Sequence, residues 1–214
     1  MPTVTRTSHP SAYHFIPPNP TIPRLWQAAQ GCRACDLYKL GTQAVLGEGP
    51  RQAAILLIGE QPGDQEDLAG RPFVGPAGRV LDEALAEVGI PRKEVFVTNA
   101  VKHFKWEPRG KRRIHQKPTL GEVKACRPWL ETEFAIVQPQ GIVCLGATAA
   151  QFVLGRDFRI TRDRGKVHPR GDTAWIIATW HPSAILRAPK PEDRQELREE
   201  LIHDLTLARS RLDE

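Results

Sequence analysis

The 214-residue chain lacks long apolar segments, and this absence limits where it can act. No stretch approaches the roughly 18 consecutive apolar residues that a membrane-spanning helix needs. The first twenty residues contain prolines and polar side chains but no apolar core of a secretory signal. Internal repeats and low-complexity tracts are also missing. We therefore expect a cytoplasmic protein without a membrane partner, with a loose N-terminal arm over residues 1–20 and a single domain over residues 21–214.

Outside one short segment, the positive and negative charges of the chain nearly cancel. Residues 102–117 hold seven Lys and Arg side chains against one acid, a local charge of +6 in a chain of +5, so the remainder sums to about −1. Such a patch is typical of proteins that bind nucleic acid, although a solvated loop can have the same composition. We predict that Lys111, Arg112 and Arg113 contact DNA phosphates, which provide affinity but no sequence information.

Cysteine is scarce, and all four residues fall into a pattern. Cys32 and Cys35 form a C-x2-C pair, and Cys126 and Cys144 follow with seventeen residues between them. Thiols stay reduced in the cytoplasm, so this pattern predicts a metal centre before disulfides. We expect the four thiolates to join the N-terminal region to the sheet through a zinc ion or an iron–sulfur cluster, because spacing alone does not choose between them. Four unrelated buried cysteines are the alternative.

Short continuous apolar runs predict the fold. Four of them are typical of strands buried on both faces, as in a parallel sheet: residues 54–60, 95–101, 141–147 and 175–180. Helical patterns at residues 77–88, 120–137, 147–154 and 192–211 alternate with these runs. This alternation predicts an α/β protein, a three-layer α/β/α sandwich around a four-stranded, mostly parallel sheet.

Polar side chains end three of the predicted strands. Glu60 closes the first run, Asn99 lies near the end of the second, and His181 follows the fourth. Ligands of open parallel sheets bind beyond the carboxyl ends of the strands, so we expect these side chains to meet in one crevice. The basic segment continues from the second strand and should border the same crevice.

The motifs at this predicted edge resemble those of uracil-DNA glycosylases. GEQPG at residues 59–63, GRPFVGPAG at 70–78, VTNAVKHF at 97–104 and HPS at 181–183 carry the resemblance, which extends from about Leu25 to Leu207. The cysteine pattern is similar to that of family 4, which carries an iron–sulfur cluster. The resemblance therefore favours a [4Fe-4S] cofactor over zinc. Gln61 and the loop GKRRIH at 110–115 resemble the UdgX type, which bonds covalently to uracil-containing DNA through the histidine of this loop.

The resemblance implies roles for the residues of the predicted crevice. Excision requires that the base leave the stack and enter a tight pocket. Phe73 would provide an aromatic face for uracil beside Gly59, and the Asn99 amide would pair with uracil O4 and N3–H. His181 would support the departing base, where negative charge develops. Ordinary core packing of Phe73, and capping or turn formation by Asn99 and His181, are the alternatives.

His115 is the residue on which the functional prediction depends. An ordinary histidine pKa near ~6.5 leaves most of the imidazole neutral at cellular pH, and a neutral imidazole can attack the sugar carbon C1′. Glu60 is expected to orient this ring and take up its proton, with Gln61 as a further catalytic residue of the same motif. Without the resemblance, a phosphate-contacting role for His115 would be favoured.

Further residues complete the prediction. Ser183 and Arg187 are expected to approach the DNA beside the flipped nucleotide. The acids that follow the first motif match no catalytic position and are expected to form a solvated stretch: Asp64, Glu66 and Asp67. We predict a monomeric uracil-DNA glycosylase for single-stranded or duplex DNA that ends covalently attached through His115. A multiple-turnover family 4-like enzyme and a non-catalytic iron–sulfur protein that binds nucleic acid are the alternatives.

Overall fold

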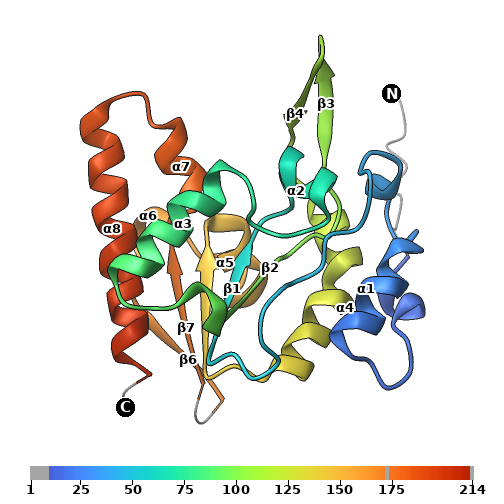
Figure 1. Cartoon of the computed structure of the whole chain (residues 1–214), viewed down its shortest axis with the longest axis horizontal. Helices are drawn as coiled ribbons and strands as arrows, with labels where there is room; N and C mark the ends of the chain where they lie inside the picture. Colours follow the sequence, from blue (N-terminus) through green and yellow to red (C-terminus); the bar gives the residue numbers. More distant parts are fainter. Residues whose placement is uncertain (1–9, 172–173, 213–214) are drawn as a thin grey trace.

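A five-stranded sheet in the order β2-β1-β5-β7-β6 forms the centre of the computed structural model, which describes residues 10–171 and 174–212 (Figure 1). The strands are β1 (Ile55–Gly59), β2 (Val95–Asn99), β5 (Gly141–Leu145), β6 (Val167–Arg170) and β7 (Ala174–Thr179). β2, β1, β5 and β7 are parallel neighbours, and β6 pairs antiparallel with β7 at one edge. The mostly parallel sheet is confirmed. The fifth strand was missed because β6 is short and its residues alternate between exposed and partly buried.

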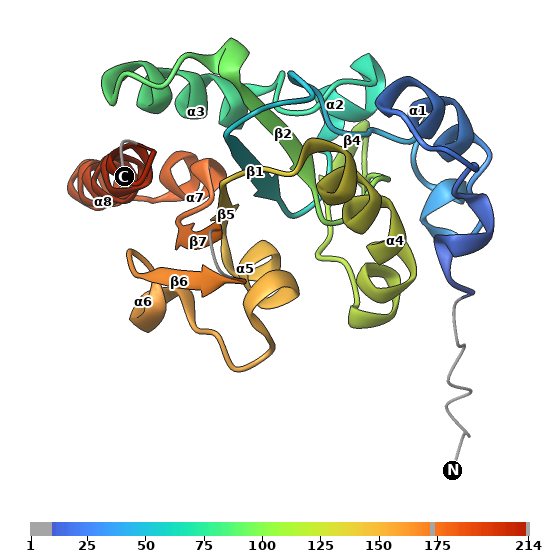
Figure 2. The ribbon, with the colours of Figure 1, turned by 90° about the horizontal axis from the view of Figure 1, so that it is seen from below.

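Helices cover both faces of this sheet, as a three-layer sandwich requires (Figure 2). One face carries α3 (Pro76–Glu87), α7 (Pro182–Arg187) and α8 (Pro191–Ser210), and the other carries α4 (Leu120–Val137) and α5 (Ala147–Leu154). Successive strand residues alternate between the two cores, because side chains of a strand point to opposite faces. Leu57 packs toward α3 and α8, whereas its neighbour Leu56 packs toward α4 and α5.

Local sequence explains where several helices begin. Thr119 caps α4 through a capping box with Glu122, and prolines occupy the first turns of α3, α7 and α8. Short helices complete the architecture: η3 (Arg92–Glu94), α2 (Asp64–Ala69) and α6 (Ile160–Asp163). No helix within the described residues is both long and apolar enough to cross a membrane.

The N-terminal region packs against α4 and forms a third core. It contains η1 (Ala12–Phe15), α1 (Ile22–Gln30) and η2 (Asp36–Lys39). Residues 1–9 of the predicted arm lie outside the described residues. Ala12 is completely buried, and the Tyr13 hydroxyl donates to Glu131 on α4. The arm predicted for residues 1–20 is therefore packed, and not loose, over this turn.

A β-hairpin projects from the body of the molecule (Figure 1). It consists of β3 (Trp106–Arg109) and β4 (Arg112–His115), paired antiparallel so that Trp106 stands opposite His115. Gly110 turns the chain with a φ of 62°, a left-handed conformation that glycine adopts without strain. The basic segment therefore forms an ordered hairpin and not a loop. His115, at the base of this hairpin, lies beside Glu60, which directly follows β1.

Candidate active site

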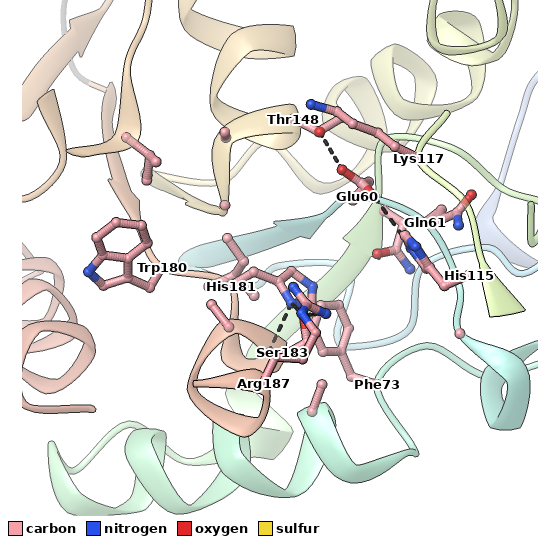
Figure 3. A pocket seen from close by; sticks show the side chains of 18 of the residues that line it. Glu60, Gln61, Phe73, His115, Lys117, Thr148, Trp180, His181, Ser183 and Arg187 are labelled. Atoms are coloured by element: carbon pink, nitrogen blue, oxygen red, sulfur yellow. Dashed lines mark hydrogen bonds and ion pairs between the residues drawn. The ribbon is translucent and has the colours of Figure 1, made fainter. Parts of the chain in front are cut away.

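A cavity of about 380 Å³ lies beyond the carboxyl ends of the parallel strands (Figure 3). It is reached by the segments that follow β1, β2, β5 and β7 and by the end of the hairpin. The predicted site residues that line it are Glu60, Gln61, Phe73, Asn99, His115, His181, Ser183 and Arg187. The lining residues come from positions 60 to 187 of the chain, so segments distant in sequence meet in one crevice at the predicted edge.

Phe73 and Asn99 both line the cavity and lie next to Gly59. Phe73 is 7% exposed and has a φ of 56°, a strained conformation for a bulky side chain. A Cβ atom on Gly59 would stand 2.3 Å from Asn99 Oδ1 and 2.8 Å from Phe73 Cζ, so this position must be glycine. The Asn99 amide makes no hydrogen bond to another described residue. A donor and an acceptor are therefore available beside an aromatic ring.

Close packing also maintains the Phe73 backbone. A Cβ atom on Gly78 would stand 1.8 Å from the Phe73 carbonyl oxygen, far inside van der Waals contact. The Glu66 carboxylate accepts hydrogen bonds from the amides of Gly63 and Gly75, the residues that precede α2 and α3. Glu66 is 8% exposed, so it is a buried brace of the cavity wall.

His181 has a defined tautomer. It follows β7 and caps α7, and the Ser183 amide donates to its Nδ1 over 3.1 Å. Because Nδ1 accepts that bond, the neutral ring carries its proton on Nε2. Burial, together with the Arg187 guanidinium and His115, lowers the pKa of His181 to about 4. The ring is therefore neutral near pH 7 and has an N–H to donate.

His115 and Glu60 face each other across the cavity mouth (Figure 3). His115 Nε2 lies 3.4 Å from Glu60 Oε1, and the His115 side chain is 48% exposed. Burial lowers the pKa of His115 below its usual 6.5, Glu60 opposes this change and Arg187 adds to it. The Thr148 hydroxyl donates to the other oxygen of Glu60. A largely neutral imidazole thus lies beside a carboxylate that is held in place from behind.

Gln61 connects the two ends of the hairpin instead of presenting its amide to the cavity. Its Nε2 donates to the carbonyls of Lys105 and Gln116, and its Oε1 accepts from the Lys105 amide. Lys105 immediately precedes β3, and Gln116 immediately follows β4. Gln61 is therefore suited to position the hairpin base, and with it His115, while its catalytic role stays a prediction.

Arg113 is bound within the protein. Its Nη1 donates to Asp67 Oδ2 over 2.6 Å and its Nε to Asp64 Oδ1 over 2.5 Å. Asp67 is completely buried and also accepts bonds from the amide and hydroxyl of Thr42. The expected solvated acidic stretch is therefore wrong for Asp67, as it is for Glu66, because distant donors satisfy both carboxylates.

The other two predicted phosphate contacts remain free. Lys111 and Arg112 are exposed near the turn of the hairpin. Within the described residues, neither side chain forms a hydrogen bond or ion pair. The three adjacent cations thus divide into Arg113, which anchors the hairpin, and two residues that can reach a polyanion.

A buried ion pair lies behind Asn99. Lys102 Nζ lies 2.7 Å from Glu133 Oε2 on α4 and also donates to Thr98 Oγ1 and to the Asn99 carbonyl. Glu133 additionally accepts the Gly47 amide. Complete satisfaction of this sort is what makes a buried pair tolerable, and it fixes the backbone from which the Asn99 amide extends.

The structure brings together only three of the four cysteines. Cys32, Cys35 and Cys126 belong to the N-terminal core, whereas Cys144 lies within β5 in the core between the sheet and α5. Burial raises the pKa of Cys126 to about 12; Lys102 opposes this change, and the thiols of Cys35 and Cys32 add to it. Burial also raises the pKa of Cys144, and Arg170 opposes this change. No other thiol contributes to the change at Cys144. The predicted set of four cysteine ligands therefore does not fit the structure at Cys144.

Two of the three gathered sulfurs accept N–H hydrogen bonds. The Lys102 amide donates to Cys126 Sγ over 3.3 Å, and Trp129 Nε1 donates to Cys32 Sγ over 3.4 Å. Such bonds are characteristic of metal-bound thiolates and tune the centre that they hold. No group of three or more His, Cys, Asp or Glu side chains in the described ranges is arranged for a single metal ion. The protein ligands of an iron–sulfur cluster bind different iron atoms, so they lie farther apart than the ligands of a single metal ion.

Thr148 is the site residue that the sequence analysis missed. It lies in the first turn of α5, directly beyond β5, and both it and Glu60 line the cavity. The third predicted strand ends at the same edge as the others, so the position of Thr148 just beyond that strand is the signal that could have identified it. Trp180, which directly follows β7, also lines the cavity. It was missed because the predicted fourth strand included it.

Comparisons with known proteins agree with this geometry. Residues 46–206 match the uracil DNA glycosylase superfamily. The type-4 uracil-DNA glycosylase of Archaeoglobus fulgidus is 41% identical over 172 residues, which cover 77% of this chain and 83% of that protein. That of Thermotoga maritima is 39% identical over 180 residues, covering 84% and 88%. A type-5 uracil-DNA glycosylase of Thermus thermophilus is 30% identical over 159 residues, covering 65% and 68%.

Proposed function

Because the chain belongs to the uracil-DNA glycosylase superfamily and is similar to its type-4 members, we propose that it excises uracil from DNA and then remains bonded to the abasic sugar through His115. The family supports the excision step. The capture step, which is the UdgX-type behaviour, is supported by one observation above all. His115 Nε2 lies 3.4 Å from the Glu60 carboxylate, and both side chains line the cavity that a flipped nucleotide would enter.

Excision would occur where Phe73 and Asn99 line the cavity. Uracil would stack on Phe73 while the Asn99 amide pairs with its O4 and N3–H. As the bond between N1 and C1′ breaks, the electron pair leaves with uracil, which becomes an anion. The Nε2–H of His181 would donate to O2 of that anion, and the Glu60 carboxylate would stabilise the positive sugar.

Capture would follow because His115 lines the cavity beside Glu60, where its imidazole could reach the sugar in place of water. In the tautomer with its proton on Nδ1, the Nε2 lone pair faces the cavity and can form the new bond to C1′. The ring becomes an imidazolium beside Glu60 and then loses the Nδ1 proton to solvent, while uracil takes up a proton. No bond to water forms at C1′, so the product is a stable N-linked adduct and each molecule would act once.

The cofactor proposal follows the family. Type-4 uracil-DNA glycosylases carry an iron–sulfur cluster, and we propose a [4Fe-4S] cluster in this chain. Cys32, Cys35 and Cys126 would hold it between the N-terminal region and α4. When bound, the cluster supplies covalent cross-links between these segments and therefore folding free energy. The reaction residues lie in the separate cavity, so no step of excision or capture requires the cluster.

The substrate side of the proposal involves the hairpin. Lys111 and Arg112 would contact phosphates of uracil-containing DNA, and Ser183 and Arg187 would lie beside the flipped nucleotide. Arg187 donates to the Ser183 hydroxyl, which also contacts His181 Nδ1, so these two residues connect the strand contact to the ring that supports uracil. All of these residues come from one chain, and we propose that the protein acts as a monomer.

A denaturing gel tests the proposed function. The protein is incubated with end-labelled single-stranded DNA that contains one uracil, then heated in detergent. We expect a shifted band for the natural protein and for His14→Ser, which replaces an exposed histidine on η1. We expect none for His115→Ser, and no shift on a thymine oligonucleotide. Free DNA with an abasic site, and no band, would instead identify a multiple-turnover enzyme.

A further inference from the structure

Cys144 is placed where it cannot share a centre with the other thiols. It is the fourth residue of β5, pairs laterally with Ile58 and Ala178, and is completely buried. Alternation along the strand directs its side chain to the same face as Ile142, under the core of α4 and α5. The other three cysteines belong to the core around α1 and the N-terminal half of α4. An iron–sulfur cluster held by those three lacks a fourth protein ligand.

His103 is the side chain that completes the set. It directly follows Lys102, whose amide donates to Cys126 Sγ, so the chain delivers it next to that sulfur. The charge of Arg33 also acts on His103, and Arg33 lies between Cys32 and Cys35 with its guanidinium on the Cys32 carbonyl. His103 therefore lies close both to the C-x2-C turn and to Cys126.

The His103 ring is also unused by the protein. It is 6% exposed and makes no hydrogen bond to any other described residue. The ring nitrogens are therefore free to bind another group. Imidazole nitrogen is a ligand of iron–sulfur clusters as well as of single ions. A bond to iron would account for a buried histidine without partners.

We propose that His103, and not Cys144, is the fourth ligand of the cluster, which therefore has three thiolate ligands and one imidazole. This assignment rests on the cofactor given under the proposed function. A neutral imidazole in place of a thiolate removes one negative charge from the centre, and such a change raises the reduction potential of iron–sulfur clusters.

The ligand set connects the cluster to the anchor of the hairpin. A Cβ atom at Gly41 would stand 3.4 Å from the His103 ring and 3.2 Å from Asp67 Oδ1, so only the Gly41–Thr42 segment separates them. Asp67 in turn holds Arg113 at the base of the hairpin. The cluster therefore braces the element that carries His115, without contacting the cavity.

Three variants test the ligand assignment through iron and sulfide content, pulsed electron paramagnetic resonance and the reduction potential. The full chain is purified without oxygen as the natural protein, His103→Ala, His103→Cys and Cys144→Ala. Iron and sulfide are measured per chain, and pulsed electron paramagnetic resonance is recorded on the reduced cluster with and without ¹⁵N-labelled histidine. We expect a nitrogen coupling that changes with the label in the natural protein and in Cys144→Ala. His103→Cys should keep its iron, lose the coupling and show a lower reduction potential.

The remaining outcomes distinguish a wrong ligand assignment from a wrong cofactor assignment. Loss of iron in His103→Ala supports the assignment, and the iron retained in His103→Cys shows that such a loss is not general misfolding. Iron without nitrogen coupling in the natural protein would overturn the His103 ligand while leaving the cofactor in place, as would loss of the cluster in Cys144→Ala with retention in His103→Ala. A natural protein without iron or sulfide would overturn both the ligand and the cofactor.

Discussion

Arg112 and Arg113 are adjacent cations, yet the structure predicts opposite effects for their removal. Arg113 bonds to buried Asp67 and to Asp64, whereas the Arg112 side chain is exposed and free among the described residues. Each alanine variant removes one positive charge from the same hairpin. A difference between the two therefore reports position and not net charge.

The magnitude follows from the bonds that Arg113 makes. A hydrogen bond to a charged group contributes about 1.5–3 kcal/mol, and Asp67 would keep only its two bonds from Thr42. Every 1.4 kcal/mol is about tenfold, so docking of the hairpin base should weaken by about 10- to 100-fold. Because a displacement of about 1 Å can cost about 100-fold in rate, we expect adduct formation in Arg113→Ala to slow by at least about tenfold at saturating DNA. Arg113→Lys should not rescue it, because an ammonium cannot bond both carboxylates as the planar fork does.

The assay measures the single-turnover rate of adduct formation with excess protein, and DNA affinity at several salt concentrations. Arg112→Ala should keep the natural rate at saturation and lose about one unit of the salt slope of binding, as expected for one phosphate contact. Arg113→Ala should show the reverse pattern. An Arg113→Ala variant with the natural saturated rate would refute the anchoring role, and an unchanged salt slope in Arg112→Ala would show that DNA is held elsewhere.

Three further predictions concern the cavity and the core. Gly78→Ala should abolish uracil excision, because the new Cβ would displace the Phe73 carbonyl; excision is read as abasic-site formation after alkali. The rate of adduct formation should be level near neutral pH and fall only as the pH drops through the His115 pKa, which lies below 6.5, because the protonated ring has no lone pair. Lys102→Met should destabilise the fold by about 3–5 kcal/mol in chemical denaturation, since Glu133 would be left buried and unpaired, and adding Glu133→Gln should recover part of the loss.

Specific outcomes would contradict each of these. Gly31→Ala is the matched control for Gly78→Ala, because its Cβ would meet only ordinary contact at 3.5 Å; equal damage by both would refute the steric argument. A rate that falls as the pH rises above 7 would require a protonated nucleophile and exclude the mechanism. Full stability of Lys102→Met would show that the ion pair is not the support of Asn99.

The sheet could be predicted from the sequence because its central strands are buried on both faces. Every residue of β1, β2 and β5 is buried, so their apolar runs are continuous and unambiguous. The same reasoning placed Glu60, Asn99 and His181 at one edge. The β3–β4 hairpin was missed because its strands are exposed and charged, so no apolar pattern marks them.

The cysteine centre was predicted only in part, for a related reason. Residue type suggested that all four thiols act together, but the side of the sheet to which Cys144 points is decided by the register of β5. The partners of the acids in α2 were equally hidden, because Asp67 is satisfied by Thr42 and Arg113 from distant segments. Sequence patterns identify buried strands well, whereas contacts between loops depend on the assembled fold.

The most direct test of the central claim is to locate the bond. The heat-stable complex is formed on uracil DNA, the DNA is digested to the sugar, and the protein is cleaved and sequenced by tandem mass spectrometry. We predict that the peptide with His115 carries a deoxyribose on the imidazole, and that this peptide is unmodified in His115→Ser. A deoxyribose on Lys111, Lys117 or any other residue, or a natural protein without any modified peptide, would contradict the account.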